Sequence, residues 1–456
     1  MTERQRPIEQ DRIKRRSNFD AVEENFTEEQ ALKEASRCLN CKNPQCVKGC
    51  PVNIQIPKFI QELKNGNLNR AGDIIRETSM LPSVCGRVCP QERQCEGKCI
   101  LGLRGEAVAI GALERYVGDN TNAEEVEITP SGKKVAVVGS GCAGITAAAD
   151  LRKAGHEVTV FEALHKLGGV LRYGIPPFRL PRIVLDKEIN NLKKMGVEFK
   201  KNVIVGKSIT LKQLQDDGFD AIFICSGAGL PKMMNIKGEN LNGVFSANEF
   251  LTRVNLMNAN QDETATPLKV GKKVAVIGGG NVAMDAARTA VRVGFEEVYI
   301  VYRRTEKELP ARLEEIRHAK EEGVVFKFLH APAEILENEG YVAGMKFELC
   351  ELGEPDESGR QRPVGTGEYI TLDVDAVIVA LGTGPNPIIQ SSAKDDGIDF
   401  EMDRKGYFVV NEETRETSVP KIFAGGDVAP VGTSNAINAM GAGKKAAKAI
   451  NEYLAQ

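Results

Sequence analysis

The sequence lacks the features that would direct it to a membrane or to nucleic acid. No apolar run in its 456 residues approaches the roughly 18 residues that a membrane-spanning helix needs. The net charge of −3 and the pI near 6.0 provide no basic surface for nucleic acid. No apolar stretch follows the basic residues Arg12, Lys14, Arg15 and Arg16, so we predict a solvated tail or a partner contact there, and no signal peptide. We expect a soluble, cytoplasmic protein.

Histidine is scarce as well. The four histidines, His156, His165, His318 and His330, are scattered along the chain, and none stands in a pattern of nucleophile and base. We therefore predict no catalytic side chain and expect cofactors to carry the chemistry.

Cysteine, in contrast, is concentrated in one region. Eight of the eleven cysteines fall between Cys38 and Cys99, with the spacing C-x2-C-x4-C-x3-C-P and then C-x3-C-P-x4-C-x3-C. In a cytosolic chain such a cluster indicates metal or redox chemistry rather than disulfides. Closely spaced thiolates followed by proline are typical of [4Fe–4S] binding, and eight cysteines fit two clusters by count. Structural zinc is the alternative, although only Cys38 and Cys41 have the spacing of a zinc knuckle.

The cysteine region is expected to be helical. Thr27-Glu-Glu-Gln30 has the pattern of a capping box, and helical patterns follow at 54–65, 68–79 and 109–116. A polar stretch at 117–132 separates this region from the remainder of the chain.

A dinucleotide-binding fingerprint comes next. An apolar strand at 135–138 leads into Gly139-x-Gly141-x-x-Gly144 and a helical segment, and a second strand ends on Glu162, 23 residues after Gly139. The glycines permit a tight turn and bring a pyrophosphate close to a helix N-terminus. An acid at the end of the second strand can accept a hydrogen bond from a ribose 2′-hydroxyl.

The same pattern recurs in a second unit. The sequence of the opening strand at 133–139 recurs almost unchanged at 272–278, and the closing strand at 220–227 has a similar counterpart at 375–382. Two such units in tandem are typical of flavoproteins that bind two dinucleotides.

The second fingerprint differs from the first at its acidic position. Gly278-x-Gly280-x-x-Ala283 is followed by a strand that ends on Arg303 and Arg304. Arginine accommodates a 2′-phosphate, so the first unit is predicted to bind FAD and the second NADP(H). Ordinary surface arginines are the alternative.

The C-terminal stretch is predicted to return to the first unit. Residues 423–428 read as a strand that meets a Gly-Gly-Asp turn, and a helix of small residues follows at 435–449. Asp427 could bond a flavin ribityl hydroxyl, so the FAD domain is predicted to be discontinuous. No C-x-x-C pair lies near the flavin region, which disfavours disulfide-reductase chemistry, and Cys142 is expected to be a packing residue.

The predicted fold class is therefore α/β, with two Rossmann-like domains of the glutathione-reductase type preceded by a helical domain that holds two [4Fe–4S] clusters. The expected bounds are 1–130 for the helical domain, 131–250 for the first part of the FAD domain, 251–385 for the NADP domain and 386–456 for the second part of the FAD domain.

Six stretches carry a resemblance to a known family. They are CLNCKNPQCVKGCPV, LPSVCGRVCPQERQCEGKC, IGALER, GGVLRYGIPPFRLP, VYRRTEKELPA and FAGGDV. With them the chain resembles the small (beta) subunit family of NADPH-dependent glutamate synthase over nearly its whole length. It is similar also to the NADPH-oxidising part of dihydropyrimidine dehydrogenase and to the large subunit of the electron-bifurcating NADH-dependent ferredoxin:NADP oxidoreductase.

The resemblance implies a ligand set that differs from the count of eight thiolates. One [4Fe–4S] cluster would be held by Cys38, Cys41, Cys46 and Cys99, and the other by Cys50, Cys89, Cys95 and Glu114. Cys85 would then be a free cysteine, although it remains the fallback ligand. The loop that contains Gly168, Gly169, Leu171 and Arg172 would contact the flavin.

Two sets of residues are thus predicted to bind the dinucleotides. The residues predicted for FAD are Gly139, Ser140, Gly141, Cys142, Ala143, Gly144, Glu162, Ala163, Gly169, Leu171, Arg172, Gly426 and Asp427. The residues predicted for NADP(H) are Gly278, Gly279, Gly280, Asn281, Val282, Arg303, Arg304 and Gly382.

The resemblance also implies a function. The chain would pass electrons from NADPH to FAD, to the clusters and then to a partner. That partner would be a larger glutamate synthase subunit, because no residues remain for a glutaminase site or an FMN-binding barrel. In a bifurcating enzyme the partners would be ferredoxin and a small subunit with flavin and a [2Fe–2S] centre. We expect the chain to form oligomers. The alternative from another class is a zinc-stabilised module that senses NADP(H) without catalysis.

Overall fold

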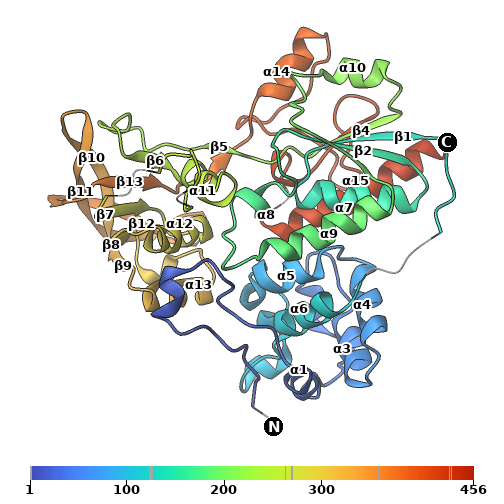
Figure 1. The fold of residues 1–456 in the computed structure, drawn as a ribbon, viewed down its shortest axis with the longest axis horizontal. Coiled ribbons are helices and arrows are strands. Elements are labelled where there is room, and N and C mark those ends of the chain that lie inside the picture. Colours follow the sequence, from blue (N-terminus) through green and yellow to red (C-terminus); the bar gives the residue numbers. More distant parts are fainter. Residues whose placement is uncertain are drawn as a thin grey trace.

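The chain forms one helical unit and two α/β units in the part described by the computed structural model, which comprises residues 3–122, 127–261, 263–268, 271–357, 359–430, 432 and 434–456 (Figure 1). The helical unit, coloured blue to cyan, lies below the first α/β unit, and the second α/β unit lies to their left. None of the helices formed by the described residues combines the length and the apolar character that a membrane crossing requires.

The helical unit is built from short helices joined by cysteine-containing loops. Its elements are η1 Lys14–Ser17, α1 Glu28–Ala35, α2 Gln45–Lys48, α3 Ile56–Lys64, α4 Leu68–Arg76, α5 Pro82–Val88, η2 Gln91–Arg93, η3 Glu96–Lys98, η4 Ile100–Leu103 and α6 Ile110–Asn120. The capping box predicted at the start of α1 is confirmed, since the side chains of Thr27 and Gln30 each bond the backbone of the other.

The first α/β unit holds a parallel sheet with the strand order β15-β4-β1-β2-β3. Its strands are β1 Lys134–Val138, β2 Glu157–Glu162, β3 Glu198–Lys201, β4 Ala221–Ile224 and β15 Ile422–Ala424. Its helices are α7 Cys142–Lys153, α8 Val170–Tyr173, α9 Arg182–Lys194, α10 Leu211–Asp216, α14 Ile388–Asp395, η6 Gly426–Val428 and α15 Ala436–Leu454. Because β15 pairs with β4, the C-terminal segment returns to this unit, as the Gly-Gly-Asp pattern predicts.

The second α/β unit repeats this parallel arrangement with the order β6-β13-β7-β8-β9. Its strands are β6 Val244–Ser246, β7 Lys273–Ile277, β8 Glu297–Tyr302, β9 Val325–Phe328 and β13 Ala376–Val379. Its helices are α11 Ala247–Asn255, α12 Asn281–Arg292, η5 Glu306–Glu308 and α13 Leu313–Glu321. An antiparallel sheet of β10 His330–Asn338, β11 Tyr341–Pro355 and β12 Gln361–Leu372 extends it.

The chain crosses twice between the α/β units, and the crossings lie side by side. β5 Leu230–Pro231 on the way out pairs antiparallel with β14 Thr383–Gly384 on the way back. β6 already pairs with β13 of the second sheet. We therefore propose that the second unit begins before Val244 rather than at 251. The other domain bounds stay predictions.

The N-terminal segment runs along the second α/β unit before it enters the helical unit (Figure 1). Arg15 in η1 is 1% exposed, and its guanidinium lies 2.7 Å from a carboxylate oxygen of Glu321 and 3.0 Å from one of Glu322. The prediction of a solvated tail or partner contact at the basic cluster is therefore wrong for Arg15. Glu9 is a third, local partner at 3.3 Å, but Glu321 and Glu322 lie about three hundred positions further along the chain, where a local pattern cannot reveal them.

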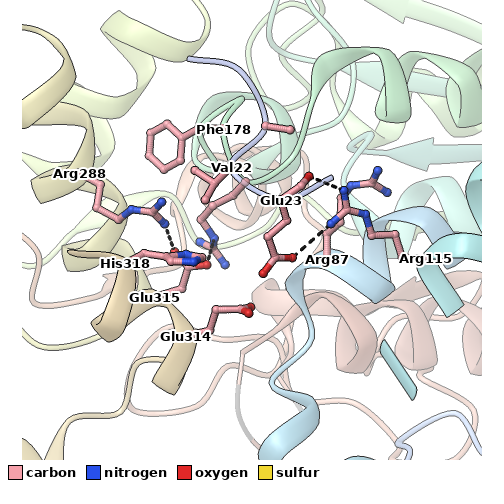
Figure 2. A pocket seen from close by; sticks show the side chains of 11 residues that line it. Val22, Glu23, Arg87, Arg115, Phe178, Arg288, Glu314, Glu315 and His318 are labelled. Atoms are coloured by element: carbon pink, nitrogen blue, oxygen red, sulfur yellow. Dashed lines mark hydrogen bonds and ion pairs between the residues drawn. The ribbon is translucent and has the colours of Figure 1, made fainter. Parts of the chain in front are cut away.

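All three units meet at this N-terminal segment, as Figure 2 shows. Its Val22 and Glu23 lie among side chains of the helical unit, of α12 and α13, and of the loop that holds Phe178. The ligand atoms of Glu9, Glu23 and His318 lie within 4.8 Å of one another. Glu9 is, however, paired with Arg317, and Glu23 with Arg115. Because arginines neutralise these carboxylates, the cluster is an interdomain clamp.

Glu322 is joined to this clamp through Arg15, which pairs with both Glu9 and Glu322, and it is fully buried. Its carboxylate lies 2.8 Å from the Arg288 guanidinium and 2.6 Å from that of Arg292, with Arg15 as the third partner. Burial alone would raise the pKa of Glu322, but hydrogen bonds from Arg292 and the charge of Arg288 hold it at about 2. Its stabilising contribution is therefore complete above its ordinary pKa of 4.5 and is lost as the pH falls toward 2.

Replacing this carboxylate is expected to destabilise the fold strongly. Glu322→Gln leaves three buried arginines without their shared partner, so we expect the free energy of unfolding at neutral pH to fall by about 3–5 kcal/mol. The neighbouring, partly exposed Glu321 provides the control, and Glu321→Gln should cost about 1 kcal/mol or less. Denaturant midpoints at neutral and acidic pH would measure both effects. Equal midpoints for the two variants, or a Glu322 effect that does not shrink with acid, would contradict this assignment.

Candidate cofactor sites

The first glycine turn is open at the position where a nucleotide phosphate would lie. A Cβ on Gly139, which has φ +117°, would lie 2.5 Å from the carbonyl oxygen of Cys225, and one on Gly144 would lie 1.9 Å from the Gly139 carbonyl oxygen. Around Gly141, no atom of the described residues lies within 4 Å of such a Cβ. The first and third glycines are therefore required by packing, whereas the second leaves room beside the N-terminus of α7. This geometry fits a pyrophosphate.

Glu162 lies at the end of β2 and ties this turn to the next loop. Its carboxylate accepts hydrogen bonds from the backbone N–H of Ser140 at 3.1 Å and of Leu164 at 2.9 Å. The Ser140 hydroxyl also donates to Glu162 and accepts from the Gly168 N–H at 2.9 Å. A carboxylate has lone pairs for about four hydrogen bonds, so Glu162 retains capacity for a ribose hydroxyl.

The predicted flavin loop approaches the turn through its backbone. A Cβ on Gly169 would lie 3.0 Å from the Gly141 Cα, and Leu171 is fully buried. Arg172 pairs with Asp186 and donates to the Leu167 carbonyl oxygen at 3.0 Å, so its side chain holds the loop in place. Ala163 is exposed.

The Gly-Gly-Asp turn lies beside the first turn of α7. Gly426 has φ +73°, and a Cβ there would lie 3.1 Å from the Cβ of Ala143. Burial raises the pKa of Asp427. Burial, followed by the charges of Asp427 and Glu162, raises the pKa of Tyr173 to about 12. Tyr173 is not among the predicted site residues, although it lies within GGVLRYGIPPFRLP.

The second glycine turn has the same open position. A Cβ on Gly278, at φ +144°, would lie 2.4 Å from the Ala380 carbonyl oxygen, whereas no described atom lies within 4 Å of one on Gly280. Gly279 packs against Leu309, to which a Cβ would approach within 2.7 Å. The space around a Cβ at Gly382 is also clear of described atoms, and Val282 is exposed.

The structure separates the two arginines at the end of β8. Arg304 is buried, lies 2.6 Å from the Asp356 carboxylate and donates to the Gln361 carbonyl oxygen at 2.7 Å. Arg303 is exposed and has no ion-pair or hydrogen-bond partner among the described residues. Arg303 is therefore the one whose guanidinium is free for a 2′-phosphate.

Four cysteines of the helical unit converge on one cavity. Cys38, Cys41, Cys46 and Cys99 line it together with apolar side chains that include Ile56, Ile60 and Val108. Burial, and then the neighbouring thiols of Cys99 and Cys38, raise the pKa of Cys46 to about 11. Four thiols directed into one apolar cavity fit a [4Fe–4S] cluster, whose binding deprotonates them.

Glu114 on α6 is near enough to Cys50, Cys89 and Cys95 for its charge to raise the pKa of each thiol. Glu114 is buried and its Oε1 has no hydrogen-bond partner in the described part of the chain, and burial raises its pKa to about 8. Burial, with the nearby Glu114 adding to it, raises the pKa of Cys50 to about 11. The pKa values of Cys89 and Cys95 are raised as well. The first cause for Cys89 is the hydrogen bond of its thiol with Cys85, and the first cause for Cys95 is burial. An orphaned buried carboxylate among three thiols fits a fourth ligand.

Glycines bring α5 and α6 close enough for this arrangement. A Cβ on Gly86 would lie 2.6 Å from the backbone nitrogen of Arg115, and one on Gly118 would lie 2.6 Å from that of Ser83. The helices therefore touch backbone to backbone, which places Glu114 opposite the cysteines of α5 and its C-terminus.

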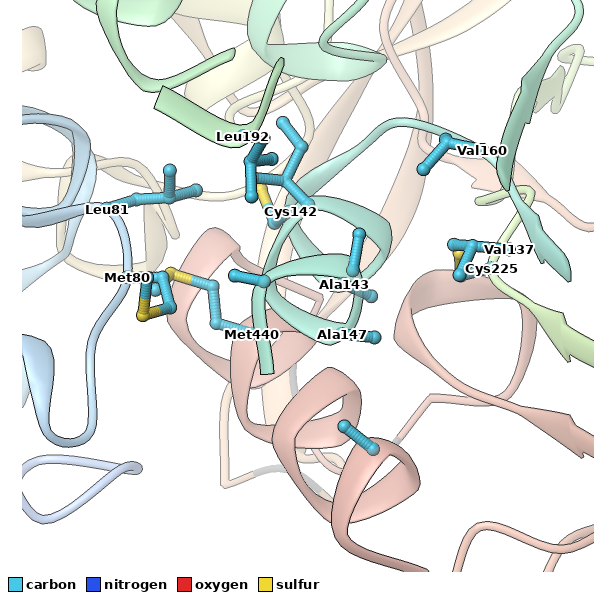
Figure 3. Close-up of a cluster of buried hydrophobic side chains, with 14 of the residues drawn as sticks. Met80, Leu81, Val137, Cys142, Ala143, Ala147, Val160, Leu192, Cys225 and Met440 are labelled. Atoms are coloured by element: carbon cyan, nitrogen blue, oxygen red, sulfur yellow. The ribbon is translucent and has the colours of Figure 1, made fainter. Parts of the chain in front are cut away.

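Cys85 faces the first α/β unit. Its sulfur lies 3.4 Å from that of Met440 on α15. Figure 3 shows this apolar cluster, in which Met80 and Leu81 of the helical unit meet Cys142 of α7 and Met440. Cys142 is buried within it, in agreement with a packing role.

These observations define a class of protein. Two Rossmann-like sheets with open glycine turns follow a helical unit with converging cysteines, which is the organisation of an iron–sulfur flavoprotein reductase. Residues 15–126 match the family described as "Dihydropyrimidine dehydrogenase domain II, 4Fe-4S cluster". Residues 133–443 match the family described as "Pyridine nucleotide-disulphide oxidoreductase". The fold resembles that of Mycobacterium tuberculosis FprA in complex with NADPH, with TM-score 0.59 and 23% identity over 72% of this chain and 85% of that chain.

Relatives in sequence narrow the class to a family. The glutamate synthase [NADPH] small chain of Escherichia coli (strain K12) is 38% identical over 96% of this chain and 95% of that protein. The small chain of Azospirillum brasilense is 34% identical over 99% of this chain and 95% of that protein. The NADP(+)-dependent formate dehydrogenase subunit beta of Moorella thermoacetica is 38% identical over 90% of this chain but only 60% of that subunit. The chain belongs to the family of the NADPH-dependent glutamate synthase small chain, and it is an NADPH-dependent oxidoreductase of the iron–sulfur flavoprotein type.

Proposed function

We propose that this chain is an electron-input subunit that oxidises NADPH at its second α/β unit and delivers the electrons through FAD and two [4Fe–4S] clusters to a partner protein. When bound, the flavin takes up hydride from NADPH and the clusters carry single electrons. The protein itself binds and separates these groups. The first glycine turn, with Glu162 and Asp427, would hold FAD, and the second turn, with Arg303, would hold NADPH.

The placement of the two cysteine sets carries this proposal. Cys89 belongs to the apolar cluster shared with α7 and α15 of the first α/β unit, and Cys85 beside it contacts Met440. Cys50 and Cys95 belong to the core of the helical unit, and Cys38, Cys46 and Cys99 pack against that same core. Cys89 is therefore the ligand that brings its set to the first α/β unit. The set that includes Glu114 would therefore receive electrons from the flavin side, and the set around the cavity would release them at the surface.

The surface at the cavity has the character of a docking site. Leu39, Ile100 and Leu103 are 61%, 52% and 81% exposed there, beside the cysteines. Lys42 and Lys48 are exposed and have no carboxylate partner among the described residues. An apolar patch with unpaired lysines fits a partner that presents apolar and acidic side chains.

Charge reversal at this surface is expected to slow electron delivery. With an acidic ferredoxin as the probe, the double variant Lys42→Glu, Lys48→Glu should reduce the NADPH-driven rate about tenfold or more at low ionic strength, because encounter is steered by charge. Reduction of ferricyanide should be unchanged. The matched control is Lys207→Glu with Lys405→Glu, on exposed lysines of the first α/β unit. Equal losses in both double variants would remove the docking assignment.

An anaerobic NADPH titration tests the function directly. We expect NADPH to bleach the flavin and then to generate two cluster signals in electron paramagnetic resonance, with NADH much less effective. A protein that binds both nucleotides but develops no cluster signal would refute the electron path.

The partner is proposed to be a larger subunit of the glutamate synthase type, because the small chains cover nearly the full length of this sequence. The related formate dehydrogenase subunit beta and the Geobacter sulfurreducens NADPH-Fe(3+) oxidoreductase subunit beta also carry this type of chain as part of a longer subunit. Affinity purification separates the possibilities. A large amidotransferase-type partner supports our proposal, whereas a small flavin and [2Fe–2S] subunit would indicate a bifurcating enzyme. A zinc-loaded protein without dye reductase activity would indicate a sensor.

A further inference from the structure

The NADP(H)-binding turn and a cysteine loop are held together by one short segment, residues 309–312 of the second α/β unit. On the nucleotide side, the Ala311 N–H donates to the Gly279 carbonyl oxygen at 3.2 Å, and the Arg312 N–H donates to the Asn281 Oδ1 at 2.9 Å. Gly279 and Asn281 belong to the second fingerprint. The backbone of this segment therefore depends on the conformation of the turn that would receive the pyrophosphate.

On the cluster side, the Arg312 guanidinium enters the helical unit. Its Nη1 donates to the Arg87 carbonyl oxygen at 2.7 Å, and its Nη2 donates to the Gln91 Oε1 at 3.0 Å. The Gln91 amide in turn donates to the carbonyl oxygens of Cys85 and Gly86, both at 3.1 Å. The Cys85 carbonyl also accepts the N–H of Cys89 at 3.1 Å. Four hydrogen bonds thus connect Arg312 with the end of α5, where Cys89 follows.

These contacts are buried and reinforced. Arg312 and Gln91 are both buried, and a Cβ on Gly111 of α6 would lie 2.5 Å from the Gln91 Nε2. The Arg93 guanidinium bonds the carbonyl oxygens of Leu309, Pro310 and Ala311 at 3.2, 2.9 and 3.1 Å. A planar guanidinium held at two carbonyl-type oxygens transmits a displacement better than a flexible surface contact.

We propose that Arg312 is a positioning residue through which occupancy of the second glycine turn by NADP(H) changes the environment of the cluster held by Cys50, Cys89, Cys95 and Glu114. The inference rests on the proposed function, because it requires that cluster. Pyrophosphate binding at the turn would fix the position of Asn281. Arg312 would transmit the resulting change in position to Gln91 and to the last turn of α5. Hydrogen bonds around cysteine ligands tune a cluster. By linkage, the factor by which NADP(H) binding shifts the equilibrium between two states of the cluster is also the factor by which the change of cluster state shifts the NADP(H) affinity.

The test uses the anaerobic holoprotein reduced with dithionite, with and without saturating NADP+. The readout is the paramagnetic signal that Glu114→Ala removes. We expect NADP+ to shift this signal in the wild type and the shift to be lost in Arg312→Met. NADP+ should still bind the variant with an affinity within about threefold, since the backbone N–H to Asn281 remains. Gln91→Leu should abolish the shift as well. It replaces Arg312→Met as the test variant if Arg312→Met does not fold.

The matched control is Arg317→Ala. Arg317 belongs to α13, the helix that Arg312 precedes, pairs with Glu9 and Glu321, and has no contact with the cysteine loop among the described residues. This variant should keep the shift. A shift that persists in both relay variants, or is absent from a wild type that shows both cluster signals and binds NADP+, overturns the inference. The absence of the second signal from the wild type would refute the proposed function instead.

Discussion

Replacement of Glu114 by alanine is expected to remove one of two cluster signals and to leave the other intact. Glu114 is a buried carboxylate whose Oε1 has no hydrogen-bond partner among the described residues, and its charge raises the pKa values of Cys50, Cys89 and Cys95. Without it, one iron loses its fourth ligand, so iron and sulfide should fall by about half in anaerobically purified protein. Glu114→Cys supplies a thiolate at the same position and should restore the cluster with an altered signal.

Cys85→Ser is the matched control, because Cys85 was the fallback ligand. Its sulfur is hydrogen-bonded with Cys89 but also lies against Met440, and we expect both clusters to survive its loss. The reverse outcome, with both clusters intact in Glu114→Ala and one missing in Cys85→Ser, would make Cys85 the ligand.

Replacement of Arg303 by alanine should weaken NADPH far more than NADH. The exposed Arg303 guanidinium is free to pair with the 2′-phosphate, and a charge-assisted hydrogen bond contributes about 1.5–3 kcal/mol. The kcat/KM for NADPH should therefore fall about 10- to 100-fold, while that for NADH changes less than about twofold. Steady-state kinetics with both nucleotides and a dye acceptor measure this.

Arg304→Ala distinguishes specificity from structure. Because Arg304 joins β8 to Asp356 and Gln361 of the antiparallel sheet, its loss should lower the stability of the protein and affect both nucleotides alike. A selective loss of NADPH in Arg304→Ala, with Arg303→Ala unaffected, would transfer the phosphate contact to Arg304.

The sequence predicts those parts of the fold that local patterns specify. The two glycine turns and the capping box of α1 follow from contacts within a few residues, and the structure has them where they are predicted. The helix predicted at 109–116 is also present, but it spans Ile110–Asn120 and so extends into the stretch predicted to separate the domains. The return of residues 422–424 to the first sheet is also predicted, because a Gly-Gly-Asp turn has a recognisable pattern.

Residues whose partners lie far along the chain could not be interpreted in this way. In the sequence Arg15 looks like a residue of a solvated tail, and only the fold shows its ion pair with Glu322. Arg304 likewise cannot be distinguished from Arg303 until the fold shows its ion pair with Asp356. Gln91 lies within LPSVCGRVCPQERQCEGKC and Arg312 directly follows VYRRTEKELPA, but neither stretch reveals that the two side chains meet at the interface between two units. The antiparallel sheet β10–β12 was not predicted.

The two cysteine sets could be predicted from the sequence only in part. The count of eight thiolates follows from the sequence, but the convergence of four of them on one cavity needs the fold. The set with Glu114 depends on the close approach of α5 and α6 at Gly86 and Gly118, which spacing alone does not reveal. The resemblance gives this ligand set, the geometry supports it, and it remains a prediction until a cluster is measured.

The most direct test of the account is metal, acid-labile sulfide and flavin analysis on one anaerobically purified sample. We expect about eight irons, about eight sulfides and about one FAD per chain, as two [4Fe–4S] clusters and one flavin site require. Zinc in place of iron, with little sulfide, would contradict the electron path and leave only the two nucleotide-binding units.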